Sequence, residues 1–375
     1  MSSGHKFDRL LCALLVAGSA LAAWLLFEVP AAMNIIDYRG IFRPYHGVRA
    51  VNKDDPELGI IHRPYLRLAG EQSGGNIGEE YQIATPLPVY RWDARYDRNG
   101  FRNNTDLKSA DICVIGDSFV EGMTVPETQL MTSALARLER KTVANLGQNN
   151  YGPQQELIVL QRYGIPLHAR VIVWMFFEGN DLSDVQFFDR WRQSPPSFWS
   201  QFVDRSFTVN SFQLLKRILI PRRPGLDRAG FVHLPNQQDV GMYFSYPAHP
   251  LKDNDRNALA ETAQILSTAS HLAAAQDSRF MVVFIPDKFR VLQPFCEFPK
   301  QSECSGWVLN DLPERFRESV VSISPGAEYL DLTPDLVAAV KAGIMPYFSD
   351  DSHWTPEGHA VAAAAISRQL RQMVP

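Results

Sequence analysis

The chain lacks the features that would indicate a nucleic-acid, nucleotide or metal partner. Its 375 residues include 37 lysines and arginines and 41 aspartates and glutamates, and the basic residues form no block. We therefore expect no nucleic-acid partner. No glycine-rich phosphate loop is present, and the nine histidines are scattered without ligand spacing, so we expect no cofactor and no metal. The hydrophobic share of 45% suffices for a large core.

Cysteine is scarce as well, with four residues in the chain. Cys296 and Cys304 close the short segment CEFPKQSEC, and the two thiols would form a disulfide in an oxidising compartment. Two unpaired thiols are the alternative that the sequence leaves open. We expect Cys113, by contrast, to be a buried strand residue.

Long apolar runs are absent except at the N-terminus. Residues 10–27 carry no ionisable side chain other than the thiol of Cys12. As a helix they would reach roughly 27 Å, close to the thickness of the bilayer hydrocarbon. We predict a short tail at 1–9 and an uncleaved anchor at 10–29, with a cleaved signal peptide as the alternative. The predicted location is the inner membrane, with a single span and a periplasmic catalytic domain.

Strand and helix patterns alternate through the second half of the chain. Short apolar runs predict strands at 111–117, 142–147, 169–181, 279–286 and 327–332. Helical periodicity fits 128–141, 153–164, 255–276 and 355–373. This alternation predicts an α/β fold with a parallel sheet, whose functional groups gather at the carboxyl ends of the strands.

Two regions interrupt or precede that pattern. Residues 37–105 are broken by proline, glycine and asparagine, which predicts an extended N-terminal arm. Residues 182–250 are rich in aromatic side chains and predict an insertion within the domain at 106–375. Either the insertion shapes a cleft or it is a structural flap without a ligand role.

The first predicted strand ends in Gly116, Asp117 and Ser118. Such a triplet is common in turns and helix caps. A serine hydroxyl at a strand end is also a candidate nucleophile, provided that a base lies within hydrogen-bond reach and that donors stabilise the oxyanion.

The next two strands also end in residues suited to this chemistry. Asn145 and Gly147 end the second strand, and a glycine there lets backbone come close to a substrate. The third strand ends in Gly179, Asn180 and Asp181. The amide of Asn180 is a candidate oxyanion donor.

A histidine near the C-terminus supplies the candidate base. His353 lies just before the terminal helix, with Asp350 three residues upstream and Asp351 two residues upstream. A carboxylate beside an imidazole fixes its tautomer and stabilises its protonated form. The histidine would take the serine proton and return it to the leaving group.

The four blocks GDSF, NLG, GND and DDSH occur in the order found in the SGNH (GDSL-like) hydrolases. The chain resembles this superfamily over about residues 96–375. The resemblance implies a three-layer, flavodoxin-like α/β sandwich with a five-stranded parallel sheet in the order 2-1-3-4-5. The finer likeness is to membrane-anchored bacterial members that add or remove acetyl groups on exported polysaccharides.

The resemblance also implies roles for the residues. Ser118 would be the nucleophile and His353 the base. Asp350 fits the usual spacing of the triad acid, and Asp351 is the reserve. The Ser118 and Gly147 N–H groups and the Asn180 side chain would form the oxyanion hole.

The implied activity is a serine esterase acting on acyl esters, most simply O-acetyl esters of an exported glycan. An O-acyltransferase and an inactive glycan-binding or assembly protein are the alternatives. The sequence does not fix the oligomeric state.

Overall fold

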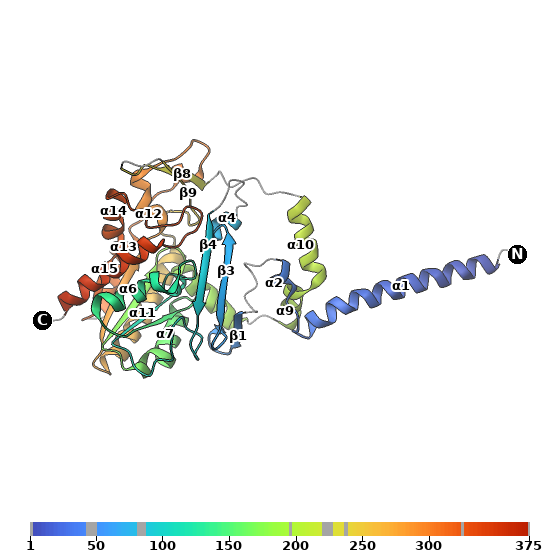
Figure 1. The fold of residues 1–375 in the computed structure, drawn as a ribbon, viewed down its shortest axis with the longest axis horizontal. Coiled ribbons are helices and arrows are strands. Elements are labelled where there is room, and N and C mark those ends of the chain that lie inside the picture. The colour runs from blue at the N-terminus through green and yellow to red at the C-terminus, as the bar shows by residue number, and fades with distance from the viewer. Residues whose placement is uncertain are drawn as a thin grey trace. The chain divides into compact units, whose positions relative to one another are not determined.

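The computed structural model describes residues 3–42, 51–80, 88–194, 197–219, 228–235, 239–323 and 326–373 (Figure 1). The chain divides into two compact units. The smaller unit combines Met1–Asn52 with Gln193–Arg222, and the larger one combines Lys53–Arg192 with Arg223–Pro375. The predicted domain boundaries remain a prediction.

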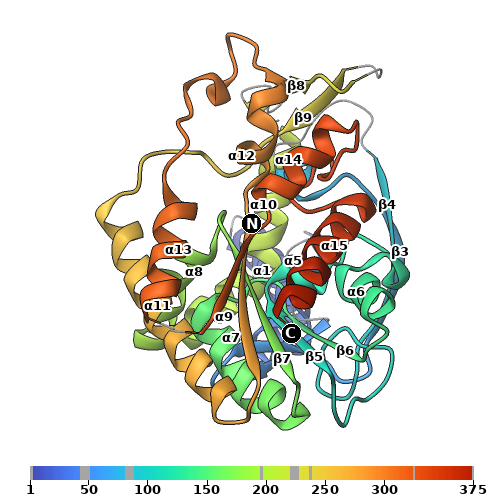
Figure 2. The ribbon, with the colours of Figure 1, turned by 90° about the vertical axis from the view of Figure 1, so that its left-hand side faces the viewer.

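A five-stranded parallel sheet forms the centre of the larger unit (Figure 2). Its strands in chain order are β5 (Ile112–Gly116), β6 (Val143–Gly147), β7 (Val171–Phe177), β10 (Arg279–Ile285) and β12 (Glu328–Asp331). They lie in the order β12-β10-β7-β5-β6, and every pair is parallel. Read from the other edge this is the order 2-1-3-4-5, so the predicted fold class is confirmed.

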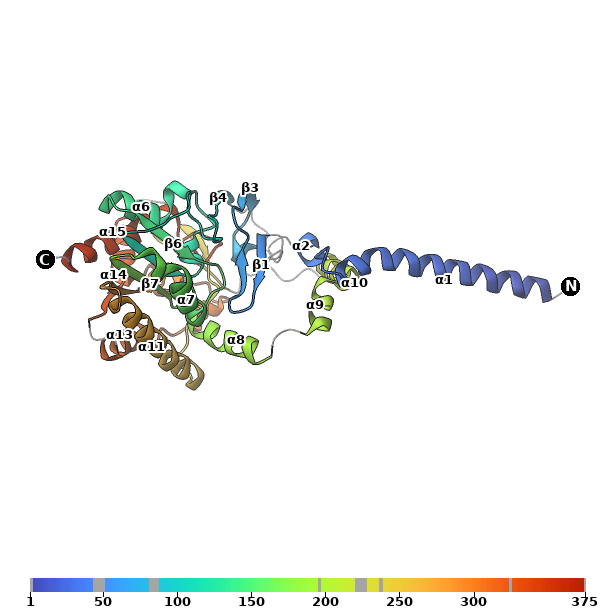
Figure 3. The same ribbon diagram turned by 90° about the horizontal axis from the view of Figure 1, so that it is seen from below.

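Helices cover both faces of the sheet because alternate strand residues are apolar on both sides. Val114, Val173 and Val283 face one core, which is shared with α6 (Met131–Glu139), α14 (Thr333–Lys341) and α15 (Pro356–Met373). Cys113, Trp174 and Phe284 face the other core, with α7 (Pro153–Val159), α11 (Asp253–Ala274) and α13 (Leu312–Ile323). Figure 3 shows α11 and α13 side by side on their face.

The segment before the sheet is more regular than the expected extended arm. Antiparallel strands β3 (Arg67–Ser73) and β4 (Val89–Arg95) form a ladder, and the short helix α4 (Asn76–Glu80) lies between them in sequence. Strands β1 (Asn52–Asp55) and β2 (Gly59–His62) pair separately. One expected extended stretch is instead helical, as α2 (Tyr38–Phe42).

The aromatic-rich insertion begins with helices that the sequence analysis did not assign. These are α8 (Asp181–Gln193), α9 (Phe198–Arg205) and α10 (Phe207–Leu219). The insertion continues in strands β8 (Ala229–Val232) and β9 (Val240–Tyr243), which form a small sheet with β11 (Cys296–Glu297). Helices α5 (Ser118–Glu121) and α12 (Lys288–Leu292) are short and begin just after β5 and β10.

Of the two states that the sequence leaves open, the structure has the unpaired one, since Cys296 and Cys304 are both free thiols. Cys296 belongs to β11, beneath Gly230 of β8, whereas Cys304 is buried in the turn Glu303–Gly306. Each sulfur is therefore held by its own packing. Cys113 is buried in β5, as expected.

The smaller unit contains the long apolar helix α1 (Ser3–Ala32) together with α2, α9 and α10. Within α1, Leu10–Ala32 is long and apolar enough to cross a membrane, and its apolar side chains are exposed. A signal sequence would pass the same test.

Candidate active site

Ser118 is the first residue of α5, directly after the central strand β5. Asp117 caps this helix, because its Oδ1 accepts the Phe119 N–H at 2.9 Å. The cap turns the chain sharply at the carboxyl end of the sheet and leaves Ser118 half-buried, while its neighbours are buried. Within the described part of the chain, the Ser118 N–H has no recorded hydrogen-bond acceptor.

The imidazole of His353 lies against the Ser118 hydroxyl. His353 Nε2 is 2.7 Å from Ser118 Oγ, although 235 positions separate the two residues. On its other side, His353 Nδ1 is 2.6 Å from Asp351 Oδ1. Serine, imidazole and carboxylate thus form one continuous hydrogen-bonded chain.

The preferred assignment of Asp350 as the partner of His353 requires correction. Asp350 Oδ2 accepts the Gly75 N–H at 2.8 Å, and its other oxygen accepts the hydroxyl of Tyr90. Both oxygens are therefore occupied away from His353. The reserve residue, Asp351, makes the contact instead, because neighbouring side chains in this loop point in different directions.

The electrostatics of the site favour a protonated His353 beside an ionised Asp351 once the Ser118 proton has been transferred. Burial opposes charge on His353, but the adjacent Asp351 carboxylate outweighs it and raises the pKa of His353 above its usual value. Burial likewise opposes the ionised form of Asp351, yet His353 keeps the pKa of Asp351 below its usual value. The imidazole can therefore accept a proton while the carboxylate stays ionised.

The N-terminal segment before β4 holds the loop that carries these residues. Asn76 N–H donates to Asp351 Oδ2 at 2.9 Å, and the Asn76 side chain exchanges hydrogen bonds with Ser352. Backbone comes so close here that a Cβ on Gly75 would lie 2.4 Å from the Asp351 Cβ. The sequence analysis missed this contact, which joins residues 275 positions apart.

Lys288 holds the same loop from the other side. It is only 1% exposed. Its Nζ donates to the carbonyls of Phe348, Ser349 and Asp351 at 2.6, 2.9 and 3.1 Å. Burial lowers the pKa of Lys288 to about 7 despite the nearby Asp351 and Asp350 carboxylates. Lys288 is therefore neither a solvated loop residue nor free to contact a substrate.

The second strand end supports the nucleophile turn. Asn145 Nδ2 donates to the Val120 carbonyl at 2.7 Å, and Asn145 Oδ1 accepts the Gly147 N–H at 3.0 Å. A Cβ on Gly147 would lie 2.4 Å from the Glu121 nitrogen, so only glycine fits beside α5. The Gly147 N–H is thus engaged with Asn145 rather than free for an oxyanion.

The third strand end begins α8. Asn180 Nδ2 donates to Asp184 Oδ2 at 2.8 Å, which leaves one further amide proton on that nitrogen. Buried Asp181 accepts the Phe177 N–H at 2.8 Å and so fixes the end of β7. Gly179 precedes them in the turn. Asn180 therefore retains a side-chain donor for chemistry.

Several acidic side chains are buried around the nucleophile turn. Burial raises the pKa of Asp117 to about 6 and that of Asp184 to about 7. The pKa values of Glu156 and Asp181 also rise, because burial and neighbouring carboxylates both disfavour their charge. All four carboxyl groups are therefore harder to ionise than exposed ones.

A second buried network braces the end of α5. Glu121 Oε1 is 2.9 Å from His62 Nε2 and accepts the Tyr96 hydroxyl at 2.5 Å. The Asn149 N–H donates to Glu121 Oε2 at 2.6 Å. Nothing in the sequence pattern around His62 or Tyr96 pointed to this contact. Within the described residues, no cluster of three or more His, Cys, Asp or Glu residues is arranged to hold a metal ion.

One family model matches part of the chain. Residues 244–375 match the family described as the SGNH hydrolase-like domain of the acetyltransferase AlgX. The predicted resemblance to the SGNH (GDSL-like) superfamily is thus confirmed. The matched SGNH-like region includes His353 and Asp351 but not Ser118. No curated protein sequence matches the chain.

Several solved structures are similar to the chain in fold. A GDSL-like lipase from Bacteroides thetaiotaomicron is 13% identical, with 70% of this chain and 88% of that chain covered at a TM-score of 0.35. A lipase/acylhydrolase from Enterococcus faecalis is 12% identical, with 70% and 95% covered at 0.36. A carbohydrate esterase family 2 enzyme with a carbohydrate binding domain, from Corynascus thermopiles, is 8% identical, with 76% and 71% covered at 0.36.

Proposed function

We propose that the protein is a serine esterase that cleaves acyl esters, with O-acetyl groups on a glycan as the substrate. The observation that carries this proposal is the 2.7 Å contact between Ser118 Oγ and His353 Nε2, continued at 2.6 Å to Asp351. A half-buried serine with a base and an orienting carboxylate in line is equipped for nucleophilic acyl transfer.

In the proposed reaction, Ser118 Oγ attacks the ester carbonyl as His353 Nε2 takes the hydroxyl proton. The tetrahedral oxyanion accepts hydrogen bonds from the Ser118 N–H and from the remaining N–H of the Asn180 amide. His353 then returns its proton to the departing alcohol, and an acyl-serine remains. Water, deprotonated by His353, attacks this ester and releases the acid together with free Ser118.

An acyltransferase is the second candidate, because the family matched by residues 244–375 is described as an acetyltransferase domain. The first half-reaction is the same, but a sugar hydroxyl replaces water in the second. The two functions differ only in the acceptor that reaches the acyl-serine.

The test is turnover of a chromogenic acetyl ester by the full-length protein, with and without a glycan acceptor. Ser118→Ala should abolish ester cleavage while circular dichroism stays unchanged. Acetylated glycan among the products would assign transfer, and free acetate alone would assign hydrolysis. Undiminished turnover by the alanine variant would remove Ser118 from its proposed role.

We further propose that α1 is retained as an inner-membrane anchor with the catalytic unit on the periplasmic side. Glu28, near the end of the apolar span, is 3% exposed. Its Oε1 accepts the Ser206 hydroxyl, the Thr208 N–H and the Thr208 hydroxyl at 3.0, 2.8 and 2.6 Å. These three contacts hold the end of α1 against the start of α10, as expected for a retained helix. The N-terminal sequence of the membrane-bound protein tests this proposal.

A further inference from the structure

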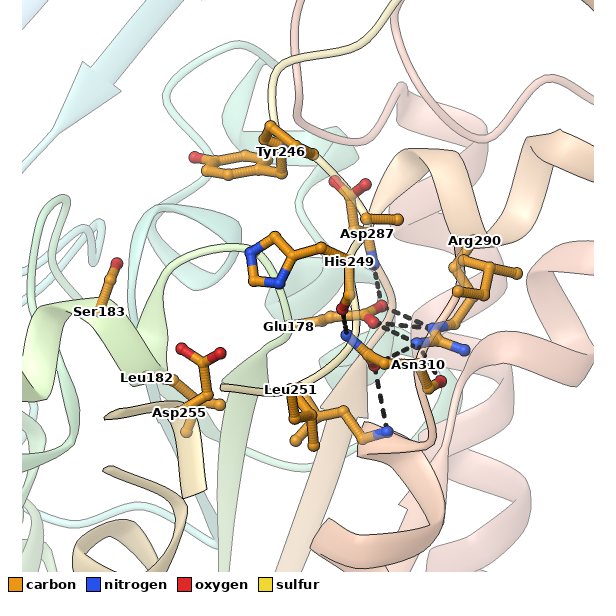
Figure 4. Close-up of a pocket in the computed structure, with 15 residues that line it drawn as sticks. Glu178, Leu182, Ser183, Tyr246, His249, Leu251, Asp255, Asp287, Arg290 and Asn310 are labelled. Atoms are coloured by element: carbon orange, nitrogen blue, oxygen red, sulfur yellow. Dashed lines mark hydrogen bonds and ion pairs between the residues drawn. The ribbon is translucent and has the colours of Figure 1, made fainter. Parts of the chain in front are cut away.

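A cavity of about 160 Å³ opens beside the candidate active site (Figure 4). Its walls come from the segment after β7, the segment between β9 and α11, the start of α12 and the residues before α13. A single water needs roughly 10–15 Å³ of such space, so the cavity has room for one sugar ring.

The cavity lies next to the proposed oxyanion donor. Gly179, which precedes Asn180, is part of its wall, and so is Tyr246. The Tyr246 ring meets Phe177 edge-on at 5.4 Å between centroids, and Phe177 packs on Phe119 at 4.4 Å. Phe119 directly follows Ser118 in the sequence. These packed rings connect the cavity wall to the turn that carries the nucleophile.

The cavity wall combines one aromatic ring with polar groups. Figure 4 shows Tyr246, His249, Ser183 and Asp255 around its open side. The Tyr246 hydroxyl has no hydrogen-bond partner recorded among the described residues, and the same holds for His249 Nε2. A few convergent polar groups beside an aromatic surface suit a hydroxyl-rich ligand.

The charges in the cavity select against acids. Glu178 is paired with Arg290 at 2.5 Å, and Arg290 is the only lysine or arginine among the described residues that line the cavity. The carboxyls of Asp255 and Asp287 remain without a basic partner in its wall. Burial and the nearby Glu178 raise the pKa of Asp287 to about 7.

We propose that this cavity is a subsite for a saccharide unit that carries no acidic group, positioned next to the ester that Ser118 attacks. The inference rests on the proposed function and adds the substrate class to it. Two unbalanced carboxyls would repel a uronate, whereas hydroxyl and amine groups find acceptors on the same side chains.

The test measures binding separately from chemistry, on full-length Ser118→Ala protein in detergent micelles. Oligosaccharides of glucose, glucosamine and glucuronate, matched in length, are titrated by calorimetry. The glucose and glucosamine oligomers should bind at least ~10-fold tighter than the glucuronate oligomer. Asp255→Asn should reduce this preference severalfold, because it keeps the oxygen that accepts the Lys252 N–H but removes the charge.

The matched control is Asp253→Asn, which removes a carboxylate from the same exposed first turn of α11 outside the cavity wall. It should leave the preference unchanged. The subsite would be overturned if the glucuronate oligomer bound as tightly as the other two or tighter. It would also be overturned if the two variants had equal effects. The third contradicting result is that no oligomer binds, although the protein without the Ser118 substitution cleaves esters. Failure of ester cleavage with the binding preference intact would instead count against the proposed function alone.

An independent observation in the smaller unit carries a second inference. Helices α9 and α10 pack on the end of α1, where Trp24 Nε1 donates to Thr208 Oγ1 at 2.9 Å and Phe27 stacks on Phe207 at 4.6 Å. Their other faces are apolar and exposed. The exposed residues are Phe198, Trp199, Val203, Phe212, Leu215, Ile218 and Leu219.

These apolar faces belong to the same unit as the exposed apolar surface of α1. On α10 the exposed apolar residues have helical spacing, as in Phe212, Leu215 and Leu219. Helix α9 carries Trp199, and tryptophan is enriched at membrane interfaces. Lys216 lies beside them on α10 and is exposed. An amphipathic helix with basic residues near its apolar face binds a lipid surface.

We infer that α9 and α10 lie in the interface of the bilayer that α1 spans. The full-length protein is placed in nanodiscs of phosphatidylcholine and phosphatidylglycerol that contain a diazirine-bearing acyl chain. After irradiation, peptides from α9 and α10 should carry lipid adducts in addition to those of α1. Phe212→Asp with Leu219→Asp should remove the α10 adducts and leave those of α1.

Lipid adducts confined to α1 would overturn this inference. The same holds if α9 and α10 instead cross-link to a second copy of the chain, because the apolar faces would then form a protein interface.

Discussion

The strand ends that carry Ser118 and Asn180 differ from the loop that carries Asp351 and His353 in how far their contacts extend along the chain. Asp117 caps α5 two residues ahead, and Asn180 bonds Asp184 four residues ahead. Asp351, by contrast, is held by Asn76 from 275 positions away and through its carbonyl by Lys288. The cap that forms the nucleophile turn is therefore local in sequence, whereas distant segments determine which carboxylate meets the imidazole.

The largest expected effect distinguishes the two neighbouring carboxylates of the loop. Asp351→Asn should lower kcat for a chromogenic acetyl ester by ~10⁴-fold, because the imidazole loses the partner that fixes its tautomer. Asp350→Asn removes charge from a residue bonded to Gly75 and Tyr90, and should cost roughly fivefold through loop position. A larger loss of kcat in the Asp350 variant than in the Asp351 variant would identify Asp350 as the triad acid, as its spacing from His353 predicts.

The prediction for the strand ends concerns Asn180. Asn180→Ala should lower kcat by ~10²-fold or more if its free amide proton reaches the oxyanion. Asp184→Asn should produce part of this loss, because Asp184 holds the Asn180 amide at 2.8 Å. An unchanged kcat in the alanine variant would limit Asn180 to a structural role in the turn.

Substitution of Lys288 tests whether distant contacts position the loop that carries Asp351 and His353. Lys288→Met leaves the carbonyls of Phe348, Ser349 and Asp351 without their donor, which should lower the free energy of unfolding by about 3 kcal/mol. Displacement of the imidazole should lower kcat by ~10²-fold with little change in KM.

Lys341→Met is the matched control, since Lys341 is exposed on α14. Urea unfolding and steady-state kinetics provide both readouts. If Lys288→Met lost stability but kept its kcat, the lysine would be structural and would not position the catalytic loop.

The smallest effect is a shift of the pH profile. His353 must be neutral to act as a base, and its pKa lies above the usual value because of Asp351. The acid limb of kcat/KM should therefore have its midpoint above ~6.5, and activity should rise with pH through it. In Asp351→Asn the residual activity should show a lower midpoint. A midpoint that does not move between the two proteins would count against this coupling.

Much of the fold follows from local patterns. The apolar runs of β5, β7 and β10 are long enough to identify buried parallel strands, and their order follows from the family resemblance. The predicted pairing of Ser118 with His353 rested on motif order, and the structure brings the two side chains together.

Other parts of the site could not be read from the sequence. Asp350 and Asp351 are adjacent and chemically identical, so only their distant partners separate them. Lys288 has the pattern of a solvated loop lysine, but three carbonyls enclose it. Gly147 was assigned a free N–H, whereas Asn145 accepts that group from two residues away. Each case depends on tertiary contacts, which the spacing of residues in the sequence does not indicate.

The central claim is that Ser118 becomes acylated with His353 as its base. The most direct measurement is peptide mass spectrometry of the full-length protein quenched in acid during turnover of an acetyl ester. The account predicts an acetyl adduct on the peptide containing Ser118, which disappears in Ser118→Ala and accumulates little in His353→Ala. An adduct on another residue, or steady turnover with Ser118 unmodified, would contradict it.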